Sequence, residues 1–259
     1  AKSSDQGENW TEIELPGQEI ADQRNPVIAL SPNETIYLFW QGKTSATSTY
    51  QIRYLTYDGS SFSEIKNLTD NPDYIQGGPV ISFDSQGKLH LAWMSQTSLP
   101  NRKELIYGIL NNQQFQATTS VNSDDVSVEH FAMLIDNQNN AHFFWHGIFH
   151  SGPSWHYITQ YRKKDSSGNW REIETLNLYE QVAETPCLIS DENNNIHLVW
   201  HSLHRSGGFN VSKINHLAKS EDSTIASSTI DSKDPYSLVV VSPSAHQPLI
   251  RIRNVNILM

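Results

Sequence analysis

Four segments of this chain share one pattern of fifteen residues, which opens with apolar residues and closes with tryptophan. The closing tryptophans are spaced by 53, 52 and 55 residues. The segments are PVIALSPNETIYLFW (26–40), PVISFDSQGKLHLAW (79–93), FAMLIDNQNNAHFFW (131–145) and PCLISDENNNIHLVW (186–200). A repeat of this period predicts one supersecondary unit per copy, stacked on its neighbours so that a shared core is buried.

Each segment has the pattern of a β-hairpin, because an apolar strand, a short polar turn and a second apolar strand follow one another. A third strand is predicted about 14 residues after the tryptophan, at 52–57, 105–110 and 156–162. Short turns then lead to a fourth strand that carries Phe62, Phe115 or Trp170. Four antiparallel strands per repeat predict an all-β fold built from the blades of a β-propeller.

We expect one domain over residues 1–259, with five blades closed into a ring by the N-terminal strand. Trp10 precedes Pro26 by the 16 residues that also separate Trp170 from Pro186, so the chain is expected to begin with a fourth strand. Pairing it with the last repeat would remove exposed sheet edges. The expected repeat units are about 26–70, 79–122, 131–178, 186–230 and 235–259, the last completed by residues 10–15. The alternative is a larger propeller of which this chain is a part.

The four segments resemble the BNR or Asp-box-like repeats of the sialidase-like propeller superfamily, over about residues 10–253. The nearest trace of the box is Ser82-Phe83-Asp84-Ser85-Gln86-Gly87. The sequence lacks the full box, a Phe-Arg-Ile-Pro motif and a matched arginine triad. The resemblance therefore implies a fold and no catalytic residue. Because such propellers are commonly exported, it also implies a secreted or periplasmic protein, with cytoplasmic residence left open.

Charge and composition exclude several classes of partner. The formal net charge is −10 and the 18 lysines and arginines are spread along the chain without a long basic run, which disfavours binding to nucleic acid. No apolar run reaches the 18 residues that a membrane span needs. Cys187 is the only cysteine, so no disulfide forms within the chain and packing has to hold the fold.

The predicted connections differ in length at the two ends of the sheets. Turns at one end have about two to four residues, whereas the segments that link the second and third strands have about ten, at 41–50, 94–103, 146–154 and 201–210. Long loops on a rigid scaffold are the usual place of binding function, so we expect a ligand at this end. We also expect His146 and His201, which each follow a repeat tryptophan, to lie near the same part of the central funnel. The candidate site residues are His146, His150, Trp155, His156, His201, His204, Arg205, Glu129, His130, Tyr74, Tyr179 and Glu184.

Three further histidines, His90, His142 and His197, recur three residues before the tryptophan. A catalytic residue is normally needed once per ring, so their recurrence predicts a structural hydrogen-bonding role. A metal site that combines His146, His150 or His201 with Glu129 or Glu184 is not assigned, and no cofactor is predicted.

The sequence leaves the choice between binding and catalysis open. The four long segments differ from one another, which favours one asymmetric site over several equivalent ones. Our main reading is a propeller that recognises a glycan or protein partner at this end. The alternatives are a polysaccharide lyase or glycoside hydrolase with a His/Tyr/Arg or carboxylate site in the same funnel, and a scaffold subunit of a larger assembly.

Overall fold

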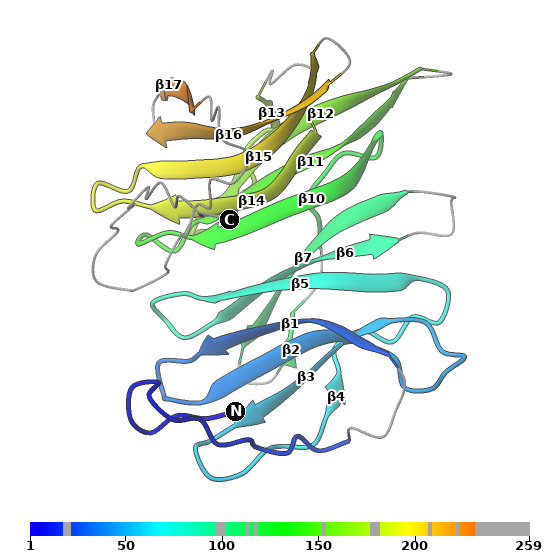
Figure 1. Cartoon of the computed structure of the whole chain (residues 1–259), viewed down its shortest axis with the longest axis vertical. Helices are drawn as coiled ribbons and strands as arrows, with labels where there is room; N and C mark the ends of the chain where they lie inside the picture. The colour runs from blue at the N-terminus through cyan, green and yellow to red at the C-terminus, as the bar shows by residue number, and fades with distance from the viewer. Residues whose placement is uncertain are drawn as a thin grey trace.

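The computed structural model describes residues 1–17, 22–96, 102–111, 114–116, 119–151, 154–176, 182–206, 209–220 and 223–230. The regular elements in these ranges are all β-strands, which confirms the all-β class. A search of the same ranges finds no helix suited to crossing a membrane. The strands form four antiparallel sheets that follow one another along the molecule (Figure 1) and are called blades one to four below.

Each blade is a meander in which strands adjacent in sequence pair with one another. Blade one contains β1 (Gln23–Leu30), β2 (Ile36–Gly42), β3 (Gln51–Tyr57) and β4 (Lys66–Asn67). Blade two contains β5 (Ile75–Phe83), β6 (Leu89–Gln96), β7 (Lys103–Asn111) and β8 (Gln114–Phe115), with β9 (Thr119–Ser120) also paired to β7. Blade three contains β10 (Val126–Ile135), β11 (Ala141–Ser151), β12 (Ser154–Lys164) and β13 (Glu174–Thr175). Blade four contains β14 (Val182–Ser190), β15 (Ile196–Ser206), β16 (Phe209–Ser220) and β17 (Ser223–Ile230).

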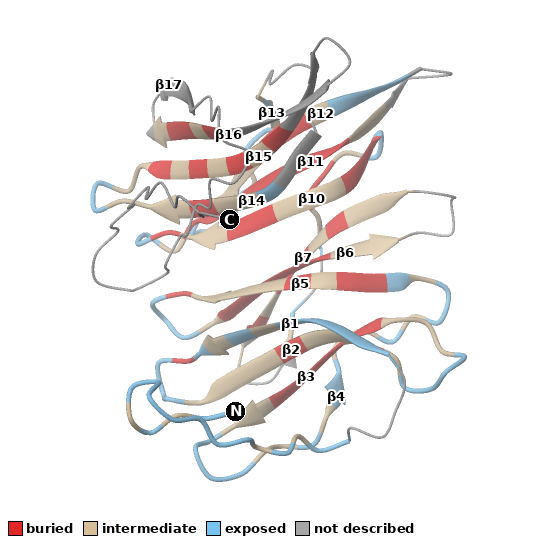
Figure 2. Ribbon diagram, in the orientation of Figure 1, coloured by how far each residue is buried: buried red, intermediate tan, exposed pale blue. Residues whose placement is uncertain are grey.

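The hydrophobic core lies between the blades, as Figure 2 shows by the buried stretches in the middle of the strands. Three clusters fill the three spaces between neighbouring blades, and each contains the repeat tryptophan of the later blade: Trp93, Trp145 and Trp200. Successive residues of one strand point to opposite faces and therefore enter different clusters. Phe143 packs toward blade two, and Phe144 packs toward blade four. Each blade is therefore stabilised by its neighbours.

Glutamine side chains fix the indole groups of three of the tryptophans. The indole N–H of Trp93 donates to Gln76 Oε1 at 2.7 Å, and that of Trp40 donates to Gln23 at 2.5 Å. In blade three the acceptor is instead Gln160 on β12, at 3.1 Å from Trp145 Nε1. Each of the three indoles keeps a hydrogen-bond partner, and for the buried Trp93 and Trp145 this bond orients the ring in the core.

An aspartate carboxylate closes the first hairpin turn in blades two, three and four. Asp136 Oδ1 accepts the backbone N–H groups of Gln138 at 2.9 Å and Asn140 at 2.8 Å. Asp84 and Asp191 make the same two contacts in their own turns. In blade one, Ser31 stands at this position and accepts the N–H of Thr35 at 3.1 Å. Short side chains that accept backbone N–H groups favour such turns, which explains the aspartate in the repeat.

The fourth residue of each turn has a left-handed backbone, at Glu34, Gly87, Asn139 and Asn194. Glycine and asparagine tolerate this conformation best. The asparagines also join neighbouring blades, because Asn139 Nδ2 donates to Ser85 Oγ at 2.8 Å and Asn194 Nδ2 donates to Asp136 Oδ2 at 3.0 Å. The turns thus stack on one another as well as closing their own hairpins.

The prediction of ten-residue loops after the tryptophan is wrong for blades three and four. In blade three, β11 continues to Ser151 and β12 starts at Ser154, and in blade four β15 and β16 pair as far as Ser206 and Phe209. The extended pairing satisfies backbone N–H and C=O groups that a long loop would leave to water. His146 and His201 consequently lie within strands.

The N-terminal residues 10–15 do not form the expected fourth strand. Thr11 pairs only with Lys2, and the intervening turn is held by Ser3 and Asp5, whose side chains accept backbone N–H groups of Gly7 and Asn9. The other half of the expected fifth blade, residues 235–259, lies outside the described residues. Ring closure, the count of five blades and the single domain therefore stay predictions.

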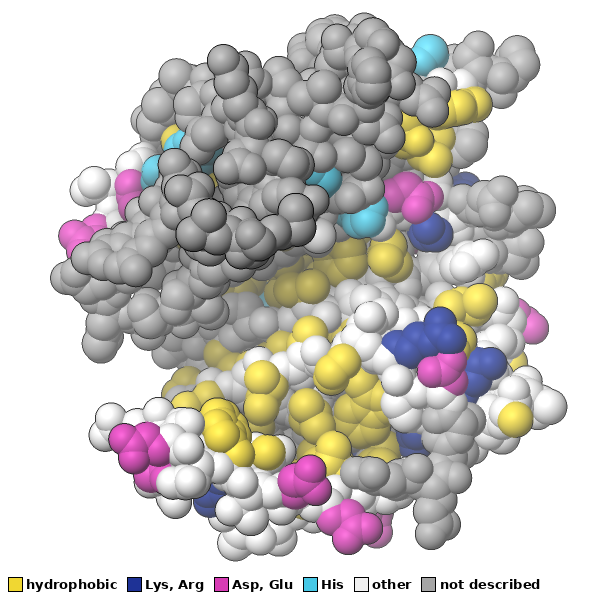
Figure 3. Space-filling model, in the orientation of Figure 1, with side chains coloured by type: hydrophobic (Ala, Val, Ile, Leu, Met, Phe, Trp, Pro, Cys, Tyr) yellow, Lys and Arg dark blue, Asp and Glu magenta, His cyan; other side chains and the backbone are white. Residues whose placement is uncertain are grey.

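One face of blade one lacks the cover that the equivalent face of the other blades has. Ile28 on β1 is 66% exposed, whereas Met133 and Leu188, at the same position of the repeat in blades three and four, are 7% and 8% exposed. Leu30 is also exposed, and hydrophobic side chains gather over β1 and β2 in Figure 3. No sheet among the described residues packs on this face.

Replacing Asp136 with Ala should destabilise the fold by about 3 kcal/mol or more, because buried donors of two blades lose their acceptor. Chemical denaturation monitored by tryptophan fluorescence measures the change. Asp165→Ala is the matched control, since the Asp165 carboxylate caps a turn at the rim of blade three and its hydrogen bonds go to Asn169 of the same turn. An equal loss in the two variants would contradict a special role of Asp136.

Candidate functional site

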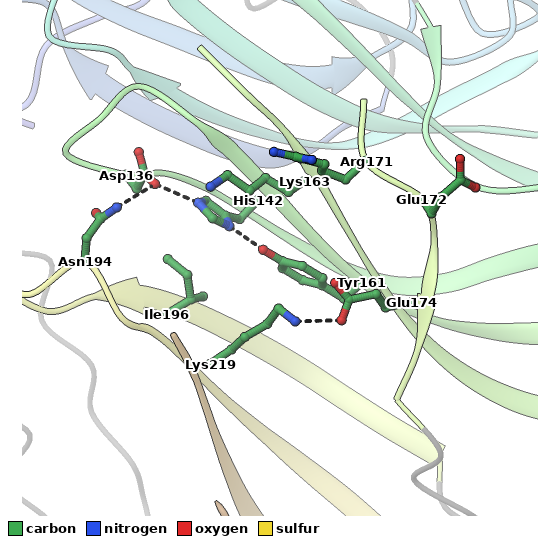
Figure 4. A pocket seen from close by; sticks show the side chains of 10 residues that line it. All are labelled: Asp136, His142, Tyr161, Lys163, Arg171, Glu172, Glu174, Asn194, Ile196 and Lys219. Carbon is green, nitrogen blue, oxygen red and sulfur yellow. Dashed lines mark hydrogen bonds and ion pairs between the residues drawn. The ribbon is translucent and has the colours of Figure 1, made fainter. Parts of the chain in front are cut away.

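The recurring histidines lie in hydrogen-bond networks, as their recurrence predicted; the networks of His90 and His142 are buried and that of His197 is partly buried. His142 Nε2 lies 2.9 Å from Asp136 Oδ2, and His142 Nδ1 lies 2.6 Å from the hydroxyl of Tyr161 on β12 (Figure 4). Blade two repeats the arrangement with Asp84, His90 and Tyr107. The network ties the turn, the second strand and the third strand of a blade together.

The protonation states in the blade-three network follow from its geometry. Burial by itself would raise the pKa of Asp136, but hydrogen bonds from His142 and Asn140 outweigh burial and hold that pKa well below its usual range. The ionised carboxylate therefore accepts the N–H of His142 Nε2. Burial raises the pKa of Tyr161 far above its ordinary value, so the phenol beside His142 Nδ1 keeps its proton. This phenol is not an activated nucleophile.

The long hairpins after the repeat tryptophans, where a ligand is expected, lie at the opposite end of the sheets, drawn on the right in Figure 1. The first strand of each blade has an irregular register near this end, between Arg24 and Val27, Gly77 and Val80, Val128 and His130, and Glu184 and Cys187. Bulges re-aim side chains and are frequent next to functional sites. In blade three the irregularity falls at Glu129 and places His130 opposite His146.

His146 is the most deeply buried of the candidate residues whose side chains are described. It is 1% exposed, and its Nδ1 lies 3.2 Å from Thr159 Oγ1 on the paired strand. Its Nε2 is buried and has no hydrogen-bond partner within the protein. An unsatisfied buried nitrogen is costly and rare, so it calls for a ligand or water to complete it.

A row of aromatic rings leads from His146 to the surface. The imidazole stacks on Tyr157, with ring centroids 5.2 Å apart and an interplanar angle of 22°. Trp155 packs edge-to-face on Tyr157, with ring centroids 5.5 Å apart. Trp155 is 57% exposed and ends the row at the surface. Trp155, Tyr157 and Thr159 alternate along β12 and therefore share one face. Exposed aromatic rings of this kind are suited to stacking on sugar rings.

The surroundings keep His146 uncharged. Burial lowers the pKa of His146 to about 4, and the nearby charge of His130 adds to this effect. At neutral pH the imidazole therefore has one protonated and one unprotonated nitrogen. Where Nδ1 carries the proton and donates to Thr159 Oγ1, the unpartnered Nε2 can accept a proton; where Thr159 donates to Nδ1, Nε2 carries the proton and can donate it.

The carboxylates near this end are already engaged by cations. Glu129 Oε2 lies 2.6 Å from Lys103 Nζ, and Asp124 Oδ1 lies 3.1 Å from Arg102 Nη2. These pairs join blade two to the start of blade three. They occupy two of the carboxylates that a two-carboxylate glycosidase mechanism would require.

The structure does not bring all the candidates together. Trp200 packs toward blade three with Phe144, so the next residue, His201, points to the other face and is separated from His146 by the sheet of blade four. His156 lies on the face of β12 opposite to Trp155 and is exposed. Tyr74 is half-buried in the connection between blades one and two, where its backbone carbonyl accepts a bond from Gln51.

Other candidates are placed only in part. For four candidates only the backbone is described, and their side chains lie outside the described residues: His150, Glu184, His204 and Arg205. Their strand partners are Trp155, His201, Val211 and Asn210, in that order. Tyr179 lies wholly outside them. Within the described part of the chain, no group of three or more His, Cys, Asp or Glu side chains is arranged to hold a metal ion.

Sequence reasoning did not single out Tyr157 and Thr159. The signal was available, because both lie at alternate positions after Trp155 on a predicted strand and so share its face. The contact with His146 depends on the hairpin register, in which Thr159 is paired with His146.

No family model matches the chain, and no curated protein matches it. Similar solved structures include a polysaccharide lyase of family PL25, an ulvan lyase bound to -[GlcA(1-4)Rha3S]-, with a TM-score of 0.53, 11% identity, and coverage of 77% of this chain and 56% of the lyase. An α-L-arabinanase of Penicillium chrysogenum complexed with arabinobiose has a TM-score of 0.58 and 12% identity, covering 80% of this chain and 66% of that one. The GH93 α-L-arabinofuranosidase of Fusarium graminearum has a TM-score of 0.54 and 9% identity with the same coverage.

These likenesses concern the fold. All three are glycan-active enzymes with the β-propeller fold, and the four antiparallel blades described above match that architecture. The chain spans little more than half of the ulvan lyase and about two thirds of the arabinan-type enzymes. The resemblance to the sialidase-like superfamily stays a prediction.

The depressed pKa of His146 predicts acid sensitivity. The unfolded chain takes up this proton near the ordinary pKa of 6.5, whereas the folded chain takes it up near 4. The contribution of neutral His146 to the free energy of unfolding is therefore fully present above pH 6.5. It is lost as the pH falls toward 4, by about 1.4 kcal/mol per pH unit. Urea denaturation at pH 7 and pH 5 should show a smaller loss for His146→Gln than for the wild type. His156→Gln, which removes an exposed imidazole, should keep the wild-type loss; a wild-type loss in His146→Gln would contradict the assignment.

Proposed function

We propose that the chain acts on a polysaccharide at the hairpin end of blade three, with His146 as the proton-transferring residue. The observation that carries the proposal is the buried imidazole with an unpartnered Nε2 next to an aromatic row that ends at exposed Trp155. The glycan-degrading activities of the similar propellers support the substrate class. A polysaccharide-degrading enzyme is one of the alternatives that the sequence left open.

The geometry favours elimination over two-carboxylate hydrolysis. A lyase abstracts the proton on the carbon next to a sugar carboxylate; as the carbon–carbon double bond forms, the C–O bond to the neighbouring sugar breaks and the leaving oxygen takes up a proton. The abstraction needs one neutral base and a group that neutralises the substrate anion. His146 is neutral at pH 7, and an arriving carboxylate would raise its pKa and strengthen it as a base. Hydrolysis would need carboxylates such as Glu129 or Asp124, whose ion pairs would first have to break.

The aromatic row would position the substrate. A sugar ring stacked on Trp155 and Tyr157 would approach the edge of the space in which His146 lies, between blades three and four. The predicted export of the chain, to the periplasm or beyond, fits a polymer too large to enter a cell.

The experiment measures turnover by the intact chain on a panel of uronate-containing and neutral polysaccharides. Reducing ends report any cleavage, and the ultraviolet absorbance of the new carbon–carbon double bond reports elimination. We expect His146→Gln to lower turnover by about 10²–10⁴-fold with binding retained, and Trp155→Ala to weaken binding by about tenfold. His156→Gln is the control and should match the wild type.

Two outcomes would contradict the proposal. Full turnover by a folded His146→Gln variant would exclude proton transfer by this residue. Binding that depends on Trp155, without turnover of any substrate by the wild type, would favour the second candidate, a non-catalytic glycan-binding propeller. The exposed aromatic pair is the observation that supports this second candidate.

A further inference from the structure

Thr159 departs from the repeat at the position that is paired with His146. In each blade the residue directly after the repeat tryptophan pairs with one residue of the third strand. That residue is Ile52 in blade one, Leu105 in blade two and Ile214 in blade four. In blade three it is Thr159, which pairs with His146. Among the four described blades, a hydroxyl therefore stands at this position only beside His146.

The hydroxyl of Thr159 is buried together with the imidazole. Thr159 is 3% exposed, and the equivalent Ile52 and Leu105 are fully buried. A buried hydroxyl costs free energy unless it forms a hydrogen bond, so threonine is not a neutral replacement for an aliphatic residue in a core. Thr159 Oγ1 has such a partner, because it lies 3.2 Å from His146 Nδ1. The imidazole is thus what makes a hydroxyl tolerable at this place.

Two contacts together fix the orientation of the His146 ring. Tyr157 stacks on the imidazole with an interplanar angle of 22°, which sets the plane of the ring. Stacking alone leaves the ring free to turn over by half a rotation about its Cβ–Cγ bond, because both orientations present the same flat face. The hydrogen bond to Thr159 selects the orientation in which Nδ1 meets the hydroxyl.

Two placements of the imidazole proton are compatible with this contact, and they differ in the group that is left without a partner. When Nδ1 donates to Thr159 Oγ1, the buried Nε2 is an acceptor that lacks a donor. When Thr159 donates to Nδ1, the proton of the neutral imidazole is on Nε2, which is then a buried N–H group that lacks an acceptor.

The first placement is the less costly of the two. An imidazole N–H points in a fixed direction in the plane of the ring, whereas a hydroxyl hydrogen rotates about its C–O bond toward whichever acceptor is near. The first placement therefore leaves an adjustable donor on Thr159, and the second leaves a fixed N–H on His146. Backbone groups show the same order, since buried N–H groups without a partner are rarer than incompletely bonded carbonyl groups.

We propose that Thr159 is a positioning residue for His146: its Oγ1 accepts the proton of Nδ1 and keeps Nε2 unprotonated. The assignment narrows the role of His146 to that of a base, because an unprotonated Nε2 can take up a proton and cannot donate one. Its meaning for turnover rests on the function proposed above. The placement of the proton is a property of the folded chain and can be measured without a substrate.

The test is nitrogen NMR of the histidine rings in the intact, isotope-labelled chain at pH 7. The signals of His146 are those that are missing from His146→Gln. Protonated and unprotonated ring nitrogens have well-separated chemical shifts, and their couplings to the ring hydrogens distinguish Nδ1 from Nε2. We expect a protonated Nδ1 and an unprotonated Nε2 in the wild type. A protonated Nε2 would overturn the proposal.

The decisive variant is Thr159→Val, which keeps the branched shape and removes the hydroxyl. We expect both proton placements of neutral His146 to be populated in this variant. On a polysaccharide that the wild type cleaves, kcat should fall by about two- to tenfold with KM retained, because only the molecules with an unprotonated Nε2 are competent. Thr159→Ser, which keeps the hydroxyl, should restore the wild-type shifts. Thr56→Val is the matched control, since Thr56 lies on the equivalent strand of blade one and should leave His146 unchanged.

The failure of this proposal can be told apart from the failure of the proposed function. Unchanged His146 shifts in Thr159→Val, or the same change in Thr159→Ser as in Thr159→Val, would overturn the role of the hydroxyl. If the shifts change as expected but the wild type cleaves no polysaccharide, the proposed function is wrong and the positioning of His146 by Thr159 is supported.

Discussion

The contact on which the rest of the structure depends is the aspartate carboxylate in the first turn of blades two, three and four. Asp136 accepts two backbone N–H groups of its own turn, the imidazole of His142 and the amide of Asn194 from the next blade. One buried charge thereby fixes the hairpin, the side-chain network behind it and the relation between two blades. A buried carboxylate is tolerated only because donors surround it. This explains why aspartate, histidine and a left-handed asparagine or glycine recur together.

The two ends of the sheets use this scaffold differently. At the turn end the recurring histidines are fully bonded, and their networks hold the blades in place. At the hairpin end the register irregularity of the first strand places His130 against His146, and the long β11–β12 hairpin presents an aromatic row to solvent. The fold is thus regular where blades are held together and irregular where a ligand is expected.

Departures from the repeat put polar groups where the other blades have apolar or fully bonded ones. His146 keeps an unpartnered nitrogen in a buried position, and Thr159 puts a hydroxyl where the other described blades have isoleucine or leucine. Both features cost stability in a structure whose blades otherwise pack through apolar side chains. A stacked architecture can carry such costs because each blade is also supported by its neighbours.

The sequence by itself determined the strands, the turns and the structural role of the recurring histidines. These follow from local physics, since alternation, turn propensity and the period of the repeat are properties of short segments. Only the tertiary structure decided how far the hairpins extend, that His146 and His201 lie on opposite sides of blade four, and that the hydroxyl of Thr159 reaches His146. Cross-strand register and the packing of one blade on the next set these features. Residues far apart in the chain meet only after folding, so no local pattern could predict their contacts.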